Sequence, residues 1–206
     1  GTIVTTSGIH LGIGANALGK MSIEGGDVYV ATGTDPLLNN NYNANFYVGA
    51  LAKSVHIRKG IFELLGGSLT VEDGLDNVYY YFSVGNARAE QNNPVGEATI
   101  TGGTFRANVK IGRNENLTYT GGSGILTVGF ETEVKGQSQA WEVGGNGTLA
   151  FQLGQDDSFY PIDLRTVTTK EAIRFTQPGA KILVDGSALT YSAFHDSIEL
   201  IEYKSG

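Results

Sequence analysis

Short runs of alternating apolar and polar residues recur along the chain, and glycines bound them. Residues 96–107 give the clearest run, G-E-A-T-I-T-G-G-T-F-R-A, and residues 19–30 and 60–71 repeat its spacing. Alternation with a period of two is typical of a strand with one buried face. A Gly-Gly pair suits a sharp corner that needs a positive φ. The three copies therefore predict a structural repeat of strand, corner and strand.

A further short strand precedes each copy and ends in an apolar-x-apolar-Gly motif. The motif glycines are Gly12, Gly49, Gly85, Gly112 and Gly144. Eleven residues separate Gly49 from Gly60, which opens the next strand, and the same number separate Gly85 from Gly96. Each unit thus contains three strands, which we call first, second and third.

Stacking the units sorts the side chains into columns, with apolar residues on the inward face and mostly polar residues on the outward face. The inward pairs of the first strands are Ile9/Leu11, Phe46/Val48, Phe82/Val84, Val109/Ile111 and Trp141/Val143. Those of the second strands are Met21/Ile23, Phe62/Leu64, Ala98/Ile100, Leu126/Val128 and Leu149/Phe151. Those of the third strands are Val28/Val30, Leu69/Val71 and Phe105/Ala107.

Three short strands cannot bury their apolar faces alone, so the units must stack on one another. We predict an all-β fold, a single-stranded right-handed parallel β-helix with about five to six coils and irregular corner loops. Strict hexapeptide repeats, which indicate the left-handed type, are absent. The rival is an antiparallel β-sandwich, but the Asn-Gly and Asp-Gly dipeptides that favour tight hairpins occur only at residues 73–74, 146–147 and 185–186.

The chain is expected to form one β-helix domain over residues 1–206. Regular coils should cover about 9–153, and atypical C-terminal coils or a cap about 154–206, with residues 191–203 as the candidate cap. Terminal coils of a solenoid usually differ from the rest because they must cover an open apolar end.

The repeat style resembles the glycine-rich, autotransporter-like (pectate-lyase-like) β-helix repeats of secreted and surface proteins of bacteria. The residues that carry the resemblance are the x-V-G motifs, the Gly-Gly corners, and the closing segments A-K-I-L-V-D-G and I-E-L-I-E-Y. The resemblance implies a right-handed β-helix in a secreted or cell-surface setting. It brings no catalytic residues with it.

Charge and composition narrow the range of partners. The chain has 14 basic and 21 acidic side chains, a formal charge of −7, and no cysteine. Nucleic acids and anionic membrane surfaces prefer a basic patch, so neither is an expected partner. Since no apolar run approaches the roughly 20 residues that cross a bilayer, we expect no membrane insertion.

The corner loops between third and first strands hold the candidate ligand-binding residues. The loops span residues 31–45 and 72–81, and stacking should place them along one edge. Aromatic rings and amides there suit a polysaccharide or cell-surface glycan. The candidates are Asn40, Tyr42, Asn43, Asp73, Asp76, Tyr79, Tyr80 and Tyr81, although the same residue types also serve loop packing and turn geometry.

Catalytic and metal signals are sparse. The three histidines His10, His56 and His195 lack metal-ligand spacing, and no catalytic residue is assigned. Asp73 and Asp76 could give oxygen ligands to calcium, the one cofactor considered, although the order of an EF-hand loop is missing. We therefore expect a non-enzymatic extracellular structural or adhesion module. The alternative is a polysaccharide lyase or glycoside hydrolase on the same scaffold.

Overall fold

The fold is built entirely from parallel β-strands in the part of the chain that the structure describes. The computed structural model describes residues 1–5, 8–12, 16–31, 45–49, 58–73, 79–87, 94–114, 122–155, 159–189 and 197–204. Nineteen strands and no helix occur in these ranges. No described segment is therefore a helix long and apolar enough to cross a membrane.

The strands form three sheets, named A, B and C. Sheet A contains β1 (Thr2–Thr5), β4 (Asp27–Val30), β7 (Ser68–Val71), β10 (Thr104–Arg106), β13 (Glu133–Lys135), β16 (Ile162–Asp163) and β19 (Ile201–Glu202). Sheet B contains β2 (Ile9–Leu11), β5 (Phe46–Val48), β8 (Tyr81–Val84), β11 (Asn108–Ile111), β14 (Trp141–Val143) and β17 (Ile173–Phe175). Sheet C contains β3 (Leu18–Ile23), β6 (Arg58–Leu64), β9 (Pro94–Ile100), β12 (Ser123–Gly129), β15 (Gly147–Gln152) and β18 (Lys181–Asp185).

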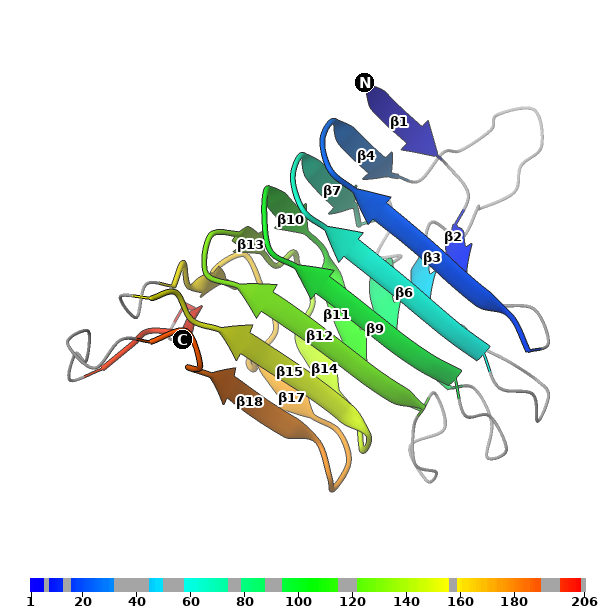
Figure 1. Cartoon of the computed structure of the whole chain (residues 1–206). Coiled ribbons are helices and arrows are strands. Elements are labelled where there is room, and N and C mark those ends of the chain that lie inside the picture. The colour runs from blue at the N-terminus through cyan, green and yellow to red at the C-terminus, as the bar shows by residue number, and fades with distance from the viewer. Residues whose placement is uncertain are drawn as a thin grey trace.

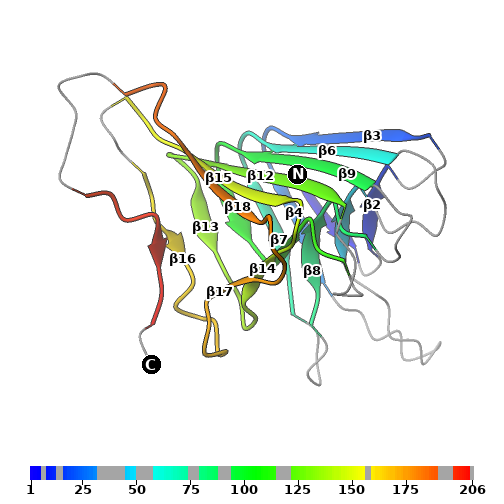
Figure 2. The same cartoon turned by 90° about the horizontal axis from the view of Figure 1, so that it is seen from below.

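Each strand pairs in parallel with the strand three places further along the chain, which is the topology of a three-sided parallel β-helix. The described strands make six coils, and β19 adds a seventh strand to sheet A. Figure 1 shows the strands of sheet C as successive arrows from β3 to β18, and Figure 2 shows β8, β14 and β17 of sheet B on the opposite side from β3, β6 and β9. The prediction of a parallel β-helix is confirmed, and the antiparallel sandwich is excluded.

The predicted inward columns form one continuous core. From Phe46 to Phe151 the inward residues of sheets B and C are buried, as are those of the third strands. The rings of Phe46, Phe62, Phe82 and Phe105 meet edge-on or tilted, with centroids 5.0–5.3 Å apart. Such ring contacts stabilise a core beyond the area they bury. Coils that could not bury an apolar face alone are therefore joined by a shared interior.

The glycine spacing has a steric cause at the corner between sheets B and C. Gly49 ends β5 with a φ of 70°. A Cβ on Gly60, which lies in β6, would lie 2.1 Å from the backbone nitrogen of Gly49. The pair Gly85 and Gly96 repeats this contact at 2.2 Å. The two backbones cross too closely for any side chain, so both positions of each pair require glycine.

The C-terminal coils continue the three ladders. β16, β17 and β18 pair with β13, β14 and β15, and β19 pairs with β16. Of the candidate cap at 191–203, the structure describes 197–203, and this part adds a strand to sheet A.

Candidate functional site

The edge between sheets C and A changes character along the β-helix. In each of the first three coils the chain turns at this edge through a Gly-Gly pair. The second glycine of each pair has a positive φ, and a Cβ on Gly67 would lie 2.1 Å from the carbonyl oxygen of Gly26 in the coil before. The Gly-Gly positions therefore carry no side chain, and their backbones stack directly on one another.

The next two coils replace the Gly-Gly pair with larger residues. Between β12 and β13 the corner reads Gly129-Phe130-Glu131-Thr132. The Thr132 hydroxyl is buried and donates a hydrogen bond to the carbonyl oxygen of Ile100 at 3.1 Å. This side-chain bond adds to the backbone hydrogen bond from the Glu133 N–H to the carbonyl oxygen of Gly103 (3.1 Å), which continues the contact that the glycine corners make with the coil before.

The following corner, between β15 and β16, is longer and brings two more aromatic residues to the same edge. Tyr160 donates its backbone N–H to the carbonyl oxygen of Phe130 at 3.2 Å. The ring of Phe159 packs edge-on against the core ring of Phe151, with centroids 5.4 Å apart. The two irregular corners are thereby held together.

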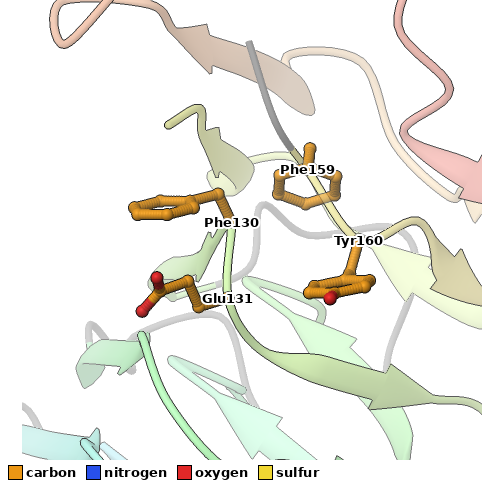
Figure 3. A pocket seen from close by; sticks show the side chains of 4 residues that line it. All are labelled: Phe130, Glu131, Phe159 and Tyr160. Atoms are coloured by element: carbon orange, nitrogen blue, oxygen red, sulfur yellow. The ribbon is translucent and has the colours of Figure 1, made fainter. Parts of the chain in front are cut away.

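An open pocket of about 430 Å³ lies at this edge, lined by Phe130, Glu131, Phe159 and Tyr160. Figure 3 shows the Phe130 ring and the Glu131 carboxylate projecting together from one corner, and the rings of Phe159 and Tyr160 from the other. The Tyr160 side chain is 65% exposed, and Glu131 is also exposed. We refer to these four residues as the aromatic corner pocket.

The chemistry of the aromatic corner pocket suits a flat, hydroxyl-rich ligand. Aromatic rings offer apolar faces of the size of a sugar ring, and a carboxylate accepts hydrogen bonds from hydroxyl groups. The scaffold below is rigid, because both corners are bonded to neighbouring coils. Preformed sites of this kind bind without a large loss of conformational entropy.

The sequence did not nominate these four residues. Two features of the sequence indicate this pocket. Phe130 and Glu131 stand where the earlier coils have a Gly-Gly pair, and Phe159 and Tyr160 follow at the corner of the next coil. Recognising it required knowing that the two corners stack.

Asp73, a predicted ligand residue, is held inside a hydrogen-bond network at the edge between sheets A and B. Its carboxylate accepts hydrogen bonds from Asn108 Nδ2 and from the Ser138 hydroxyl and backbone N–H. Its own N–H donates to Gln137 Oε1 at 2.9 Å. The corner at Asn108 in the next coil is short, so the Asp73 carboxylate also contacts Ser138, two coils away. Asp73 therefore links three successive coils.

Both carboxylate oxygens of Asp73 are therefore engaged by protein groups. Asp76 lies outside the described residues. Among the residues that the structure describes, no three His, Asp or Glu side chains gather into a metal site. Calcium at Asp73 and Asp76 stays a prediction, and the described contacts of Asp73 show a structural role.

The three consecutive tyrosines point into different surroundings. Tyr79 is 38% exposed, whereas Tyr80 is buried in the core. Tyr81 is partly buried, with Lys110 Nζ 3.4 Å from its ring centroid, within range of a cation–π contact. Of the three, Tyr79 is thus the one with a freely accessible ring. Asn40, Tyr42 and Asn43 lie outside the described residues.

Among the described residues, the charged groups that most resemble a catalytic cluster lie beside sheet B. Arg113 Nε lies 2.8 Å from Glu142 Oε2, and their side chains are only 19% and 14% exposed. Burial, followed by the negative charge of Glu142, raises the pKa of Tyr81 to about 12. The phenol therefore stays protonated at ordinary pH, and the carboxylate is engaged by the arginine.

Comparison with known proteins adds no relative. The chain matches no protein-family model, and no curated protein or solved structure is significantly similar to it.

Proposed function

We propose that the chain is a non-enzymatic structural module that binds carbohydrate through the aromatic corner pocket. The observation that carries this is the exposed Tyr160, held to Phe130 by a backbone hydrogen bond in a pocket that Glu131 also lines, where two successive corners lack the Gly-Gly pair. Aromatic side chains with a polar neighbour are a recurrent means of holding a sugar ring.

The setting and handedness belong to the same proposal. A secreted or cell-surface, adhesive role in a bacterium suits a rigid rod with a net charge of −7 and no cysteine. We take the winding to be right-handed, because crossovers between parallel strands of one sheet are right-handed in about 98% of cases.

A glycan array tests the binding with variants that differ only at the pocket. We expect retention of a glycan by the native chain and about tenfold weaker binding by Tyr160→Ala, since stacking on the ring is lost. Leu65→Ala is the matched control, because Leu65 is 48% exposed beside a Gly-Gly corner of the same edge. If no glycan is retained, or both variants weaken equally, the pocket is not the binding site.

The corner loops 31–45 and 72–81 stay a second predicted contact. Tyr79→Ala in the same array separates the two edges: a loss confined to Tyr79→Ala would move the site to the loops.

An enzyme remains the alternative, and the charged cluster of Lys110, Arg113 and Glu142 favours it. Polysaccharide lyases and glycoside hydrolases need a base or paired carboxylates next to the substrate. Incubation with alginate or pectin, followed for unsaturated uronates or new reducing ends, tests this alternative. Product formation that Glu142→Gln abolishes would replace the binding proposal.

A further inference from the structure

At the C-terminal end of the β-helix, apolar residues are exposed at positions whose equivalents in the preceding coils face the core. Ile182 and Val184 continue the inward columns of sheet C, yet they are 49% and 47% exposed. Phe175, which continues a column of sheet B, is also exposed. An open apolar pocket of about 330 Å³ lies here, with Phe175, Ile182 and Ile201 in its lining.

Among the described residues, the strands at this end have no strand partner along their outer edges. β17 and β18 are the last described strands of sheets B and C, and β19 is the last of sheet A. Figure 1 shows β18 at the outer border of its sheet, with no described strand beyond it. Unpaired edges beside apolar side chains favour strand addition.

The sequence of β18, Lys181-Ile182-Leu183-Val184-Asp185, is complementary to itself in an antiparallel pair. If Leu183 lies opposite its own copy, Lys181 faces Asp185 of the second copy, and Ile182 faces its Val184. Residues directly opposite one another share a face, so the apolar pairs fall inside and the charged pairs outside.

The remaining two sheets match under the same two-fold rotation. The two-fold axis is perpendicular to sheet C, so the rotation places sheet A of one copy over sheet B of the other. The last strand of sheet A, β19, then lies antiparallel to the last strand of sheet B, β17, of the second copy. Ile201 then faces Phe175, and Glu202 faces Arg174, so the inward positions meet inward positions and the opposite charges meet. Since β19 extends sheet A by one strand, each new pair lies one strand spacing apart, about 4.8 Å.

Stacking head to tail fits less well. With β1 of a second copy added next to β19, sheets B and C would each lack one strand at the junction. Direct pairing of β18 with β3 in the register of the coils would instead place Lys181 opposite Lys20, because these residues occupy one row. Like charges directly opposite destabilise a strand pair.

From this self-complementarity we infer that the occupant of the C-terminal end is a second copy of this chain, docked end to end about a two-fold axis through Leu183. The interface is isologous, so it closes as a dimer and does not propagate into a filament. The apolar cores of the two β-helices become continuous across it.

Sedimentation and light scattering should give a concentration-dependent species of twice the 21.8 kDa of one chain and nothing larger. Lys181→Asp should shift the protein to monomer, because it places two acidic side chains opposite each other. The combined variant Lys181→Asp with Asp185→Lys should recover the dimer. In a head-to-tail assembly Lys181→Asp would instead strengthen the contact with Lys20.

Cross-linking gives a second readout, because a disulfide traps the associated species covalently. The chain has no cysteine, and residues directly opposite in an antiparallel pair have Cα atoms about 4.5–5.5 Å apart, within reach of a disulfide. Leu183→Cys should therefore form a disulfide dimer on mild oxidation. Leu18→Cys, at the 67% exposed position of the other end, is the control and should not.

Two results would overturn the inference. One is a chain that stays monomeric at every concentration and cross-links no faster at Leu183→Cys than at Leu18→Cys. The other is a ladder of species larger than a dimer, which would indicate head-to-tail assembly.

Discussion

The glycine corners and the aromatic corners occupy the same edge of one β-helix, yet they solve the turn between sheets C and A differently. At Gly26, Gly67 and Gly103 the backbone of one coil rests on the carbonyl oxygen of the coil before, and no side chain fits. At 130–132 larger residues take these positions, and the buried Thr132 hydroxyl adds a hydrogen bond to the Ile100 carbonyl oxygen. The replacement places an aromatic ring and a carboxylate at corner positions where the earlier coils have glycine.

The largest expected effect comes from placing a methyl group in a glycine corner. Gly67→Ala would put a Cβ 2.1 Å from the Gly26 oxygen at a φ of 75°, so we expect a loss of about 3–5 kcal/mol of unfolding free energy from clash and backbone strain. Gly25→Ala is the matched control, since a Cβ there meets nothing within 4 Å. Urea titration measures both, and equal losses would show that close stacking does not explain the corner.

The second largest loss of unfolding free energy is expected from the side-chain network between sheets A and B. Asp73→Ala removes the acceptor for Asn108 and Ser138, and we expect a loss of about 2–4 kcal/mol because the buried Asn108 amide keeps only its bond to the Tyr80 carbonyl oxygen and the Ser138 hydroxyl loses its acceptor. Asp73→Asn keeps one acceptor oxygen and should lose less. A midpoint of urea unfolding that is unchanged in Asp73→Ala would contradict the structural role of this carboxylate.

The aromatic corner should depend on its threonine more weakly. Thr132→Val keeps the shape but removes the bond to the Ile100 carbonyl, with an expected loss of about 1 kcal/mol. Thr127→Val, on the outward face of β12, serves as the control for a threonine outside the corner. If the two variants unfold at the same urea concentration, the hydroxyl does not anchor the corner.

The smallest change in stability is expected at the pocket itself. Tyr160→Ala should change the unfolding free energy by no more than about 0.5 kcal/mol, because the ring is 65% exposed. Thermal unfolding checks this. A large loss would mean that the ring supports the fold and that any binding defect of the variant has a structural cause.

The repeat allowed most of the fold to be predicted. The alternation within 96–107 and the recurrence of its glycines indicated three strands per unit, and every inward column from Phe46 to Phe151 is buried as expected. These features depend on nearest neighbours in the chain and on one repeated coil, so local pattern is sufficient.

The candidate site could be predicted less well. Asp73 reads as a loop carboxylate open to ligands, but its partners lie 35 and 65 residues away in the sequence. The sequence predicts Tyr79, Tyr80 and Tyr81 together as ligand-binding residues. The alternation of side chains instead points Tyr80 into the core, while Tyr79 stays exposed. Which group is free for a ligand depends on what the adjacent coils bring to it.

The sequence by itself determined the strands, the glycine corners and the inward columns, because side chains alternate within each strand and the glycines recur at the same spacing in successive coils. Only the tertiary structure decided that Phe130 and Tyr160 share one edge, that Asp73 joins three coils, and that β18 leaves apolar residues uncovered. These properties arise between coils, where the lengths of separate corners decide which side chains meet.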